Sequence, residues 1–337
     1  MYDHGDAYRF PQLAARESRL EILQTNANPT LGANLAWEHA SVLVGLVQGY
    51  DLNPSVGGSA LHVGWARHGE GIAVGVGGAV KHSDVRSHNS SGNASNLLRS
   101  YETEMEGSAG ISFPSLRLDL AGTVLWDDRG VTRAEFTNNH IEIRREIDPK
   151  PRPGINARWR HPFSTTSELV LAAGWQDRKL EWNTVKDVDG REDSNAKAHQ
   201  LGDEYFVQTL VAMSHPKVDR VYVYSGYRAT RLPSFDAGST SSRTGLNVSR
   251  VASAGLAIES ELLKGFRAMA GIGGRYSYGR NDSSESTTSS SRKTETLNDS
   301  MTWGASYQYR RLQLTGQLAS DLNLQDLFGT LDLVVTL

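Results

Sequence analysis

Short segments in which apolar and polar residues alternate with a period of two dominate this sequence. In 115–125, for example, Leu116, Leu118 and Leu120 alternate with Arg117, Asp119 and Ala121. Successive side chains of a β-strand point to opposite sides, so the pattern predicts strands with one apolar face and one polar or small face. Fourteen such strands are expected, at about 41–50, 58–67, 71–81, 99–112, 115–126, 153–160, 166–176, 204–214, 218–229, 246–260, 265–280, 296–309, 311–320 and 326–337.

The connections between these segments alternate in length. Short ones occur at 68–71, 113–115, 161–166, 214–219, 261–265 and 310–311, and long polar ones at 82–98, 127–152, 177–203, 231–245 and 281–295. Short periplasmic turns and long extracellular loops are typical of outer-membrane barrels. We therefore expect an all-β, transmembrane, antiparallel up-and-down β-barrel of about 14 strands in the bacterial outer membrane. An extra hairpin within 127–152, and a count between 12 and 16, stay open.

Composition narrows the alternatives. The 337 residues include no cysteine, so disulfides, thiolate metal sites and thiol nucleophiles are excluded. Lys and Arg number 35 against 38 Asp and Glu, with no basic block, so no nucleic-acid partner is expected. No apolar run approaches the ~20 residues of a membrane helix. The first residues carry no signal peptide, so an exported chain would be the mature form.

The last ten residues, FGTLDLVVTL at 328–337, alternate to the end of the chain. We expect this strand to pair with the first one, because an open sheet edge in lipid leaves backbone groups without hydrogen bonds. The ending is similar to the signal that outer-membrane proteins present to their assembly machinery, although that signal usually ends in an aromatic residue and this one ends in Leu337. The lipid bilayer, lipopolysaccharide and the assembly machinery are the expected partners.

Residues 28–81 carry a more specific pattern. NPTLGANLAWEHASVLVGLVQGYDLN is followed by GSALHVGWARHGEGIAVGVGGAVK, a strand and then a hairpin with a Gly-containing turn. This resembles the opening of the FadL/PorV superfamily, whose members carry an Asn-Pro-Ala-(Gly/Ala)-Leu segment. Asn28, Pro29 and Leu31 match, and Thr30 stands where alanine is usual.

The resemblance implies a 14-stranded barrel, residues 33–337, and a segment, residues 1–32, that folds into the lumen as a hatch. A frayed periplasmic tail is the alternative for 1–32. The small inward residues Gly75, Gly77 and Ala79 would leave room for a hatch. The implied function is passive uptake of small molecules, with fatty-acid-like hydrophobic ones as the family's example. The alternative is a non-transporting PorV-like barrel that serves as a surface docking or secretion partner.

The alternation also predicts which charged residues line the lumen, where they could set selectivity or form stabilising ion pairs. On one strand Glu102, Glu104 and Glu106 form an acidic ladder. The remaining lumen candidates are Arg117, Asp119, Arg158, Arg160, Arg267, Arg275 and Arg310.

No catalytic constellation is found, so we expect neither an enzyme nor a cofactor. His88 with Ser90 or Ser91 in 87–93 is similar to the His-x-Ser pairing of outer-membrane phospholipases, but it falls in a polar loop. Asp187, Asp189 and Glu192 form a weak calcium candidate, because carboxylate oxygens suit Ca²⁺ but the regular ligand spacing is incomplete.

Overall fold

The computed structural model describes residues 10–13, 18–25, 29–48, 59–69, 71–91, 94–136, 140–147, 149–189, 191–215, 217–235, 244–285, 288–320 and 330–336. Within these residues the chain is all-β. Nineteen strands form one antiparallel up-and-down sheet, and a single 3₁₀ turn, η1 (Pro11–Leu13), precedes them. No helix in the described part of the chain is long and apolar enough to cross a membrane.

The strands follow one another along the chain with the bounds β1 (Arg19–Thr25), β2 (Pro29–Ala36), β3 (Ala40–Gln48), β4 (Ser59–His68), β5 (Ala73–Ser91), β6 (Ala94–Phe113), β7 (Leu118–Phe136), β8 (His140–Ile147), β9 (Arg152–Pro162), β10 (Glu168–Asp177), β11 (Leu180–Val188), β12 (Arg191–Gln200), β13 (Asp203–His215), β14 (Val218–Phe235), β15 (Thr244–Leu263), β16 (Phe266–Glu285), β17 (Thr288–Tyr309), β18 (Leu312–Ser320) and β19 (Thr330–Thr336).

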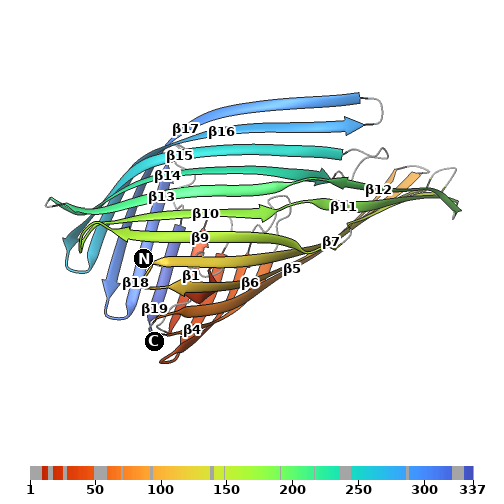
Figure 1. The fold of residues 1–337 in the computed structure, drawn as a ribbon. Helices are drawn as coiled ribbons and strands as arrows, with labels where there is room; N and C mark the ends of the chain where they lie inside the picture. Colours follow the sequence, from red (N-terminus) through yellow and green to blue (C-terminus); the bar gives the residue numbers. More distant parts are fainter. Residues whose placement is uncertain are drawn as a thin grey trace.

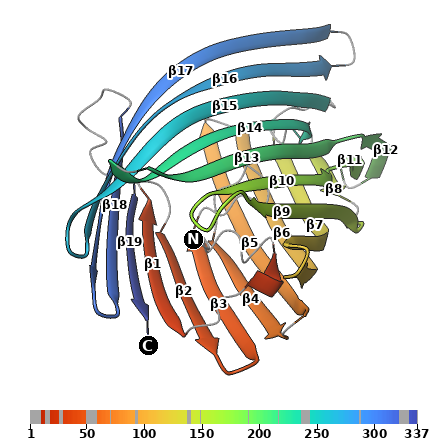
Figure 2. The same ribbon diagram turned by 60° about the vertical axis from the view of Figure 1, so that its left-hand side comes forward.

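The strand pairings return to their starting point. Most strands pair with the strands next to them in sequence. At two places the sheet skips intervening strands: β7 pairs with β9, past β8, and β10 pairs with β13, past β11 and β12. The last strand, β19, pairs with β18 and with β1, and β1 pairs with β2. Figure 2 shows β18, β19, β1 and β2 side by side. The last strand thus pairs with a strand near the N-terminus, as expected, but that strand is β1 and not the first expected strand, 41–50, which is β3.

All fourteen expected strands are present, as β3–β7, β9, β10 and β13–β19. The sheet already begins at Arg19 with β1, within the segment 1–32 expected to form a hatch or a periplasmic tail. The division into hatch and barrel at residue 32 stays a prediction. The edges of β2 and β19 need hydrogen-bond partners, and β1 supplies them to both. Its Leu20 and Ile22 keep 38% and 42% of their surface exposed, as outward residues of a strand do.

The long connections contain the other additional strands. The extra hairpin left open in 127–152 exists, because β7 continues to Phe136 and pairs there with β8. β11 then pairs with β8 and with β12, so that three strands extend the wall beyond the rim of β9 and β10. Figure 1 shows this extension at the right, continuing the line of β7.

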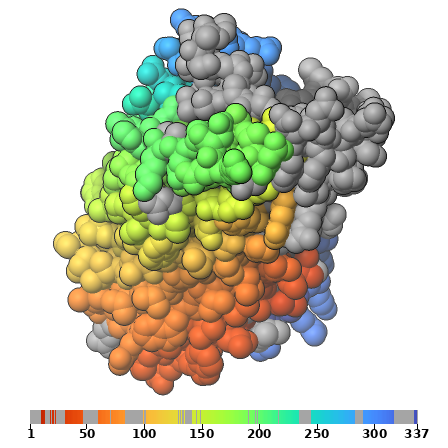
Figure 3. Space-filling model, turned by 90° about the vertical axis from the view of Figure 1, so that its right-hand side faces the viewer, coloured from red at the N-terminus to blue at the C-terminus, as the bar shows by residue number. Residues whose placement is uncertain are grey.

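Strand length varies strongly around the wall. β5, β6, β7 and β14–β17 have 18–22 residues, whereas β1–β4, β18 and β19 have 7–10. At ~3.4 Å per residue and ~45° of tilt, a 20-residue strand rises about 48 Å, well beyond the ~25 Å apolar band of an outer-membrane barrel. The long strands therefore project past such a band. In Figure 3 the strands from β4 to β13 follow one another up one face in order of colour, from orange to green.

The two faces of the wall differ as the alternation predicts. On β5, Val74, Val76 and Val80 are 39–52% exposed on the outer face. The alternating residues Gly75, Ala79 and Lys81 are buried on the inner face. Apolar side chains thus point away from the enclosed space, the reverse of a water-soluble barrel.

The turn η1 lies against the inner face of β4, β5 and β6 (Figure 2, in red). The amide Nε2 of Gln12 donates hydrogen bonds to the carbonyl oxygens of Ile111 and Leu120, both at 3.2 Å. A Cβ on Gly75 would overlap the backbone of Pro11 and Gln12, and one on Gly110 would overlap the Gln12 side chain. Glycine is required where the N-terminal segment touches the wall.

We predict that Gly75→Ala displaces residues 10–13 from the wall and lowers the unfolding free energy by about 1–3 kcal/mol, the usual cost of overpacking. Gly122→Ala is the matched control, because nothing lies within 4 Å of a Cβ there. Hydrogen exchange of residues 10–13 and urea unfolding of the refolded protein measure both effects. Equal behaviour of the two variants would contradict the contact.

Candidate functional site

Charged side chains line the inner face of β5, β6, β7 and β9, and they are paired with one another. Nearest the short turns, Asp119 is fully buried and accepts a hydrogen bond from Nε of Arg158 at 3.0 Å. The hydroxyl of Ser112 donates to its other oxygen at 2.5 Å, and Arg160 lies 3.6 Å away. The Arg158 guanidinium also lies over the ring of Phe10, 5.4 Å from its centroid, so this cluster connects the wall to the N-terminal segment.

A second cluster lies further along the same strands. Nζ of Lys81 is 4.0 Å from Glu104, and both side chains are fully buried. Arg152 pairs with Asp127 at 3.1 Å, again with both side chains buried. Glu102, Glu104 and Asp127 bring carboxylate oxygens within 4.8 Å of one another. Such oxygens could hold a divalent cation, but Lys81 and Arg152 already supply positive charge there.

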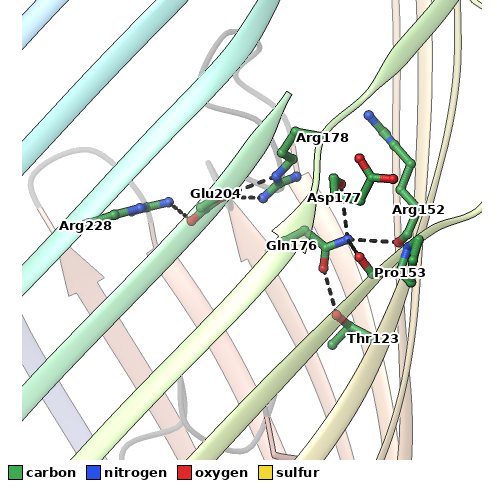
Figure 4. Close-up of polar contacts among 8 residues, drawn as sticks. All are labelled: Thr123, Arg152, Pro153, Gln176, Asp177, Arg178, Glu204 and Arg228. Carbon is green, nitrogen blue, oxygen red and sulfur yellow. Dashed lines mark hydrogen bonds and ion pairs between the residues drawn. The ribbon is translucent and has the colours of Figure 1, made fainter. Parts of the chain in front are cut away.

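A polar network crosses β7, β9, β10, β13 and β14 at the level where β10 ends (Figure 4). Nε2 of Gln176 donates to the carbonyl oxygens of Arg152 at 2.9 Å and Pro153 at 3.2 Å, while its Oε1 accepts from Thr123 at 2.7 Å. Beside it, Glu204 pairs with Arg178 at 2.8 Å and with Arg228 at 2.6 Å. These contacts fix the strands against one another where β10 ends.

The opposite wall is more open to solvent. Arg267 on β16 pairs with Glu259 at 2.9 Å, yet its side chain is 43% exposed. The hydroxyl of Tyr222 donates to the other oxygen of Glu259 at 2.7 Å. Arg228 is 54% exposed in spite of its ion pair. Arg275 is also exposed and points inward, on the opposite side from Ile272 and Tyr276. Inward side chains with this exposure indicate space for water inside the wall.

Two cavities lie where the three-stranded extension meets the rim. The larger, about 520 Å³, is lined by residues that include Glu146, Lys179, Glu181, Lys197 and His199. The smaller, about 190 Å³, shares Ile147, Lys179 and Glu181 with it and reaches Asp127 and Arg152. We call the two together the mouth cleft.

Glu181 lines both cavities of the mouth cleft. Hydrogen bonds from Lys150 and Lys179 lower the pKa of its carboxyl to about 2. This carboxylate therefore remains ionised, and tied to both lysines, throughout the physiological pH range.

The structure separates the predicted lumen residues into two groups. Asp119, Arg158 and Arg160 meet in one cluster, and Glu102 and Glu104 are buried inward, with Glu106 in phase with them. Arg117 and Arg310 do not line the lumen. Both are exposed and lie in tight turns, 114–117 and 310–311, with φ 53°.

The weak calcium candidate lies at the tip of the β11–β12 hairpin, where Asp187 pairs with Glu192 and Asp189 has φ 51°. In the described residues these side chains do not form a group of three ligands, whereas Glu102, Glu104 and Asp127 do. The side chains of His88, Ser90 and Ser91 lie outside the described part.

Sequence reasoning missed Lys81, Asp127, Arg152, Arg178, Glu204 and Arg228. The first three are in phase with inward residues already identified: Lys81 follows Gly75, Gly77 and Ala79, and Asp127 follows Asp119. Lys81 lies within the expected strand 71–81, and extending the expected strands 115–126 and 153–160 by one residue would have included Asp127 and Arg152. The ion pairs across β10, β13 and β14 have no such signal, because they depend on the register between strands.

Comparison with known proteins gives a limited result. No protein-family model matches the sequence, and no curated protein matches it. Among solved structures the chain is similar to the ferric yersiniabactin uptake receptor FyuA of Yersinia pestis, with 6% identity and a TM-score of 0.32, over 95% of this chain and 79% of that one. It is also similar to the alcaligin outer-membrane receptor FauA of Bordetella pertussis, with 7% identity and a TM-score of 0.28, over 96% and 76%.

A third similar structure is Pseudomonas aeruginosa FpvA in complex with iron and a pyoverdine, with 7% identity and a TM-score of 0.29, over 90% of this chain and 61% of that one. We base no function on likenesses of this size. The resemblance of residues 28–81 to the FadL/PorV superfamily gains no support from these comparisons and stays a prediction.

We predict that Asp119→Asn lowers the unfolding free energy by about 3–5 kcal/mol, because it leaves the buried Arg158 without its carboxylate partner. Asp193→Asn is the control: its pair with Lys186 is 2.8 Å long but 51% and 39% exposed, so a loss of at most about 1 kcal/mol is expected. Urea unfolding in lipid vesicles measures both values. A small loss at Asp119 would show that the cluster does not stabilise the wall.

Proposed function

We propose that this chain is a transmembrane β-barrel of the bacterial outer membrane that lets small polar or ionic solutes pass through a charge-lined interior. The observation that carries the proposal is the division of strands such as β5, β7 and β16 between an apolar outer face and an inner face with charged residues. On β16 the outward residues run Phe266, Ala268, Ala270, Ile272 and Gly274 before the first tyrosine. That stretch of nine residues matches the 9–11 that a strand needs to cross a membrane.

Aromatic residues mark the end of this band. Tyr276 and Tyr278 follow on β16, and Tyr205 on β13 and Trp175 on β10 lie in the same cross-strand row as Tyr278. Amphipathic rings are enriched at headgroup level. Arg280 comes next on β16, so the first outward charge lies directly beyond the rings.

The interior supports polar rather than hydrophobic solutes. Its described inward residues include Arg228, Arg267 and Arg275, all accessible to water, and the mouth cleft is lined by lysines, carboxylates and a histidine. Fatty acids would leave these groups poorly solvated. We therefore do not carry the fatty-acid expectation from the FadL/PorV resemblance into this proposal.

In this proposal the segment Phe10–Leu13 narrows the interior on one side. It contacts Gly75, Arg158 and the strand carbonyl oxygens that accept hydrogen bonds from Gln12. It acts as a small internal plug in place of the 32-residue hatch. Three further expectations remain predictions: that the assembly machinery recognises β19, that the chain has no enzymatic activity, and that it is the mature form of an exported protein.

A surface docking barrel is the second candidate function. The observation that favours it is the three-stranded extension of β8, β11 and β12, which forms an ordered platform beyond the rim. Such a platform could bind a partner protein whether or not the barrel conducts.

Single-channel conductance in planar bilayers tests the two functions. The comparison is between the intact chain and a chain lacking residues 1–17, which keeps β1 and the Ser18 hydroxyl that binds the backbone of Ala36. We expect steps from the intact chain, larger ones after truncation, and a shift toward cation selectivity in Arg275→Glu. Silence from both inserted, folded chains would reject conduction and favour the docking barrel.

Two adjacent substitutions on β13 test membrane insertion itself. Val207 is 51% exposed on the outer face, and Gln208 points inward. Arginine on a lipid face costs ~2–4 kcal/mol at the bilayer midplane and less near its interfaces. We predict that Val207→Arg lowers the unfolding free energy in vesicles by about 1–3 kcal/mol and that Gln208→Arg changes it little. Equal losses would refute the assignment of the faces.

A further inference from the structure

Three rows of side chains cross the outer face of β10 and β13–β17, each fixed by the strand register. The lowest row runs through Val207, Tyr227, Ala252, Tyr276 and Leu297. The middle row runs through Trp175, Tyr205, Ala229, Arg250, Tyr278 and Glu295. The upper row runs through Asp177, Asp203, Arg231, Val248, Arg280 and Lys293.

The rows change from apolar and aromatic to charged within four residues along each strand. Tyr205 and Tyr227 lie with ring centroids 6.0 Å apart, and the Arg250 guanidinium lies 5.9 Å from the centroid of Tyr278. Ala229, between Tyr205 and Arg250 in the register, is only 5% exposed although it is on the outer face. The aromatic and cationic groups therefore form one packed surface.

Cations are concentrated on four neighbouring strands of this surface. Arg231, Arg250, Arg280 and Lys293 come from β14, β15, β16 and β17, and all four are exposed. Neighbouring strands are ~4.8 Å apart, so the four lie within about 15 Å across the sheet. Arg280 pairs with Asp282 at 2.8 Å, and Lys293 also attracts that carboxylate. Among the described residues, no carboxylate forms an ion pair with Arg231 or Arg250.

We propose that these four residues form a binding site for the phosphorylated headgroup of lipid A, the diphosphorylated glycolipid of the outer leaflet. The proposal rests on the outer-membrane function proposed above. Three features support lipid A as the occupant. The cations lie just beyond the apolar band, where lipid phosphates reside, and guanidinium groups bind phosphate oxygens through paired hydrogen bonds. The tyrosines provide a flat surface for the sugar and the start of the acyl chains.

The site is tested with the triple variant Arg231→Gln, Arg250→Gln, Arg280→Gln. Its matched control is Arg191→Gln, Arg275→Gln, Arg292→Gln, which removes the same charge from the tip of β12 and from the inner face of β16 and β17. Native mass spectrometry of each refolded protein in detergent micelles measures binding of diphosphoryl lipid A, monophosphoryl lipid A and phosphatidylglycerol.

We expect the wild type and the control to bind diphosphoryl lipid A equally and to prefer it to the other two lipids. Each cation near an anionic lipid contributes about a fivefold gain in affinity, so the triple variant should bind about 100-fold more weakly. The single variant Arg250→Gln, expected to lose about fivefold, provides the same test should the triple variant not fold. An equal loss in the control, or wild-type affinity in the triple variant, would overturn the site.

Flotation of each protein with lipid vesicles separates this proposal from the one on which it rests. A wild-type chain that does not insert counts against the outer-membrane function and the lipid site together. A wild-type chain that inserts, while the triple variant binds lipid A as tightly as the control, counts against the lipid site alone.

Discussion

Backbone hydrogen bonding at the strand edges is the constraint on which the rest of this structure depends. A strand in hydrocarbon has no water to pair its N–H and C=O groups, and each unpaired group costs several kcal/mol. Residues 19–25 show the effect: they pair with β2 on one edge and with β19 on the other. This segment has no strong alternation of apolar and polar residues, yet it forms a strand. It does so because the edges of β2 and β19 need hydrogen-bond partners.

The same arrangement determines where charge can lie. Apolar residues on the outer face favour inward positions for the charged residues within the band, although Asp299 on β17, in register with Gly274, lies on the outer face. Asp119, Lys81 and Glu104 are fully buried on the inner face, and each lies close to an opposite charge. Such buried ion pairs add little folding stability compared with an apolar core, but removing one partner lowers the stability strongly. They therefore act mainly to hold neighbouring strands in a single register.

The sequence predicted the strands well and the site in part, for one physical reason. Alternation reports which face a residue takes, so the fourteen strands and the inward positions of Glu102, Asp119 and Arg158 could be read from it. It does not report where a turn ends, and for that reason Arg117, expected in the strand 115–126, lies in the turn 114–117 instead. Nor does it report partners across strands: the pairing of Glu204 with Arg178 and Arg228 follows from the register of β10, β13 and β14.

The interior is asymmetric, and this bears on function more than the number of strands does. On β4–β6 glycines let η1 approach the backbone, and side chains there are buried. On β14 and β16, inward arginines keep 54% and 43% of their surface exposed. In the channel proposed above, water and small solutes would pass along the β14–β16 wall, while the opposite wall holds the N-terminal segment. In such a barrel the exposed arginines, rather than the buried ion pairs, are the groups that a passing solute meets.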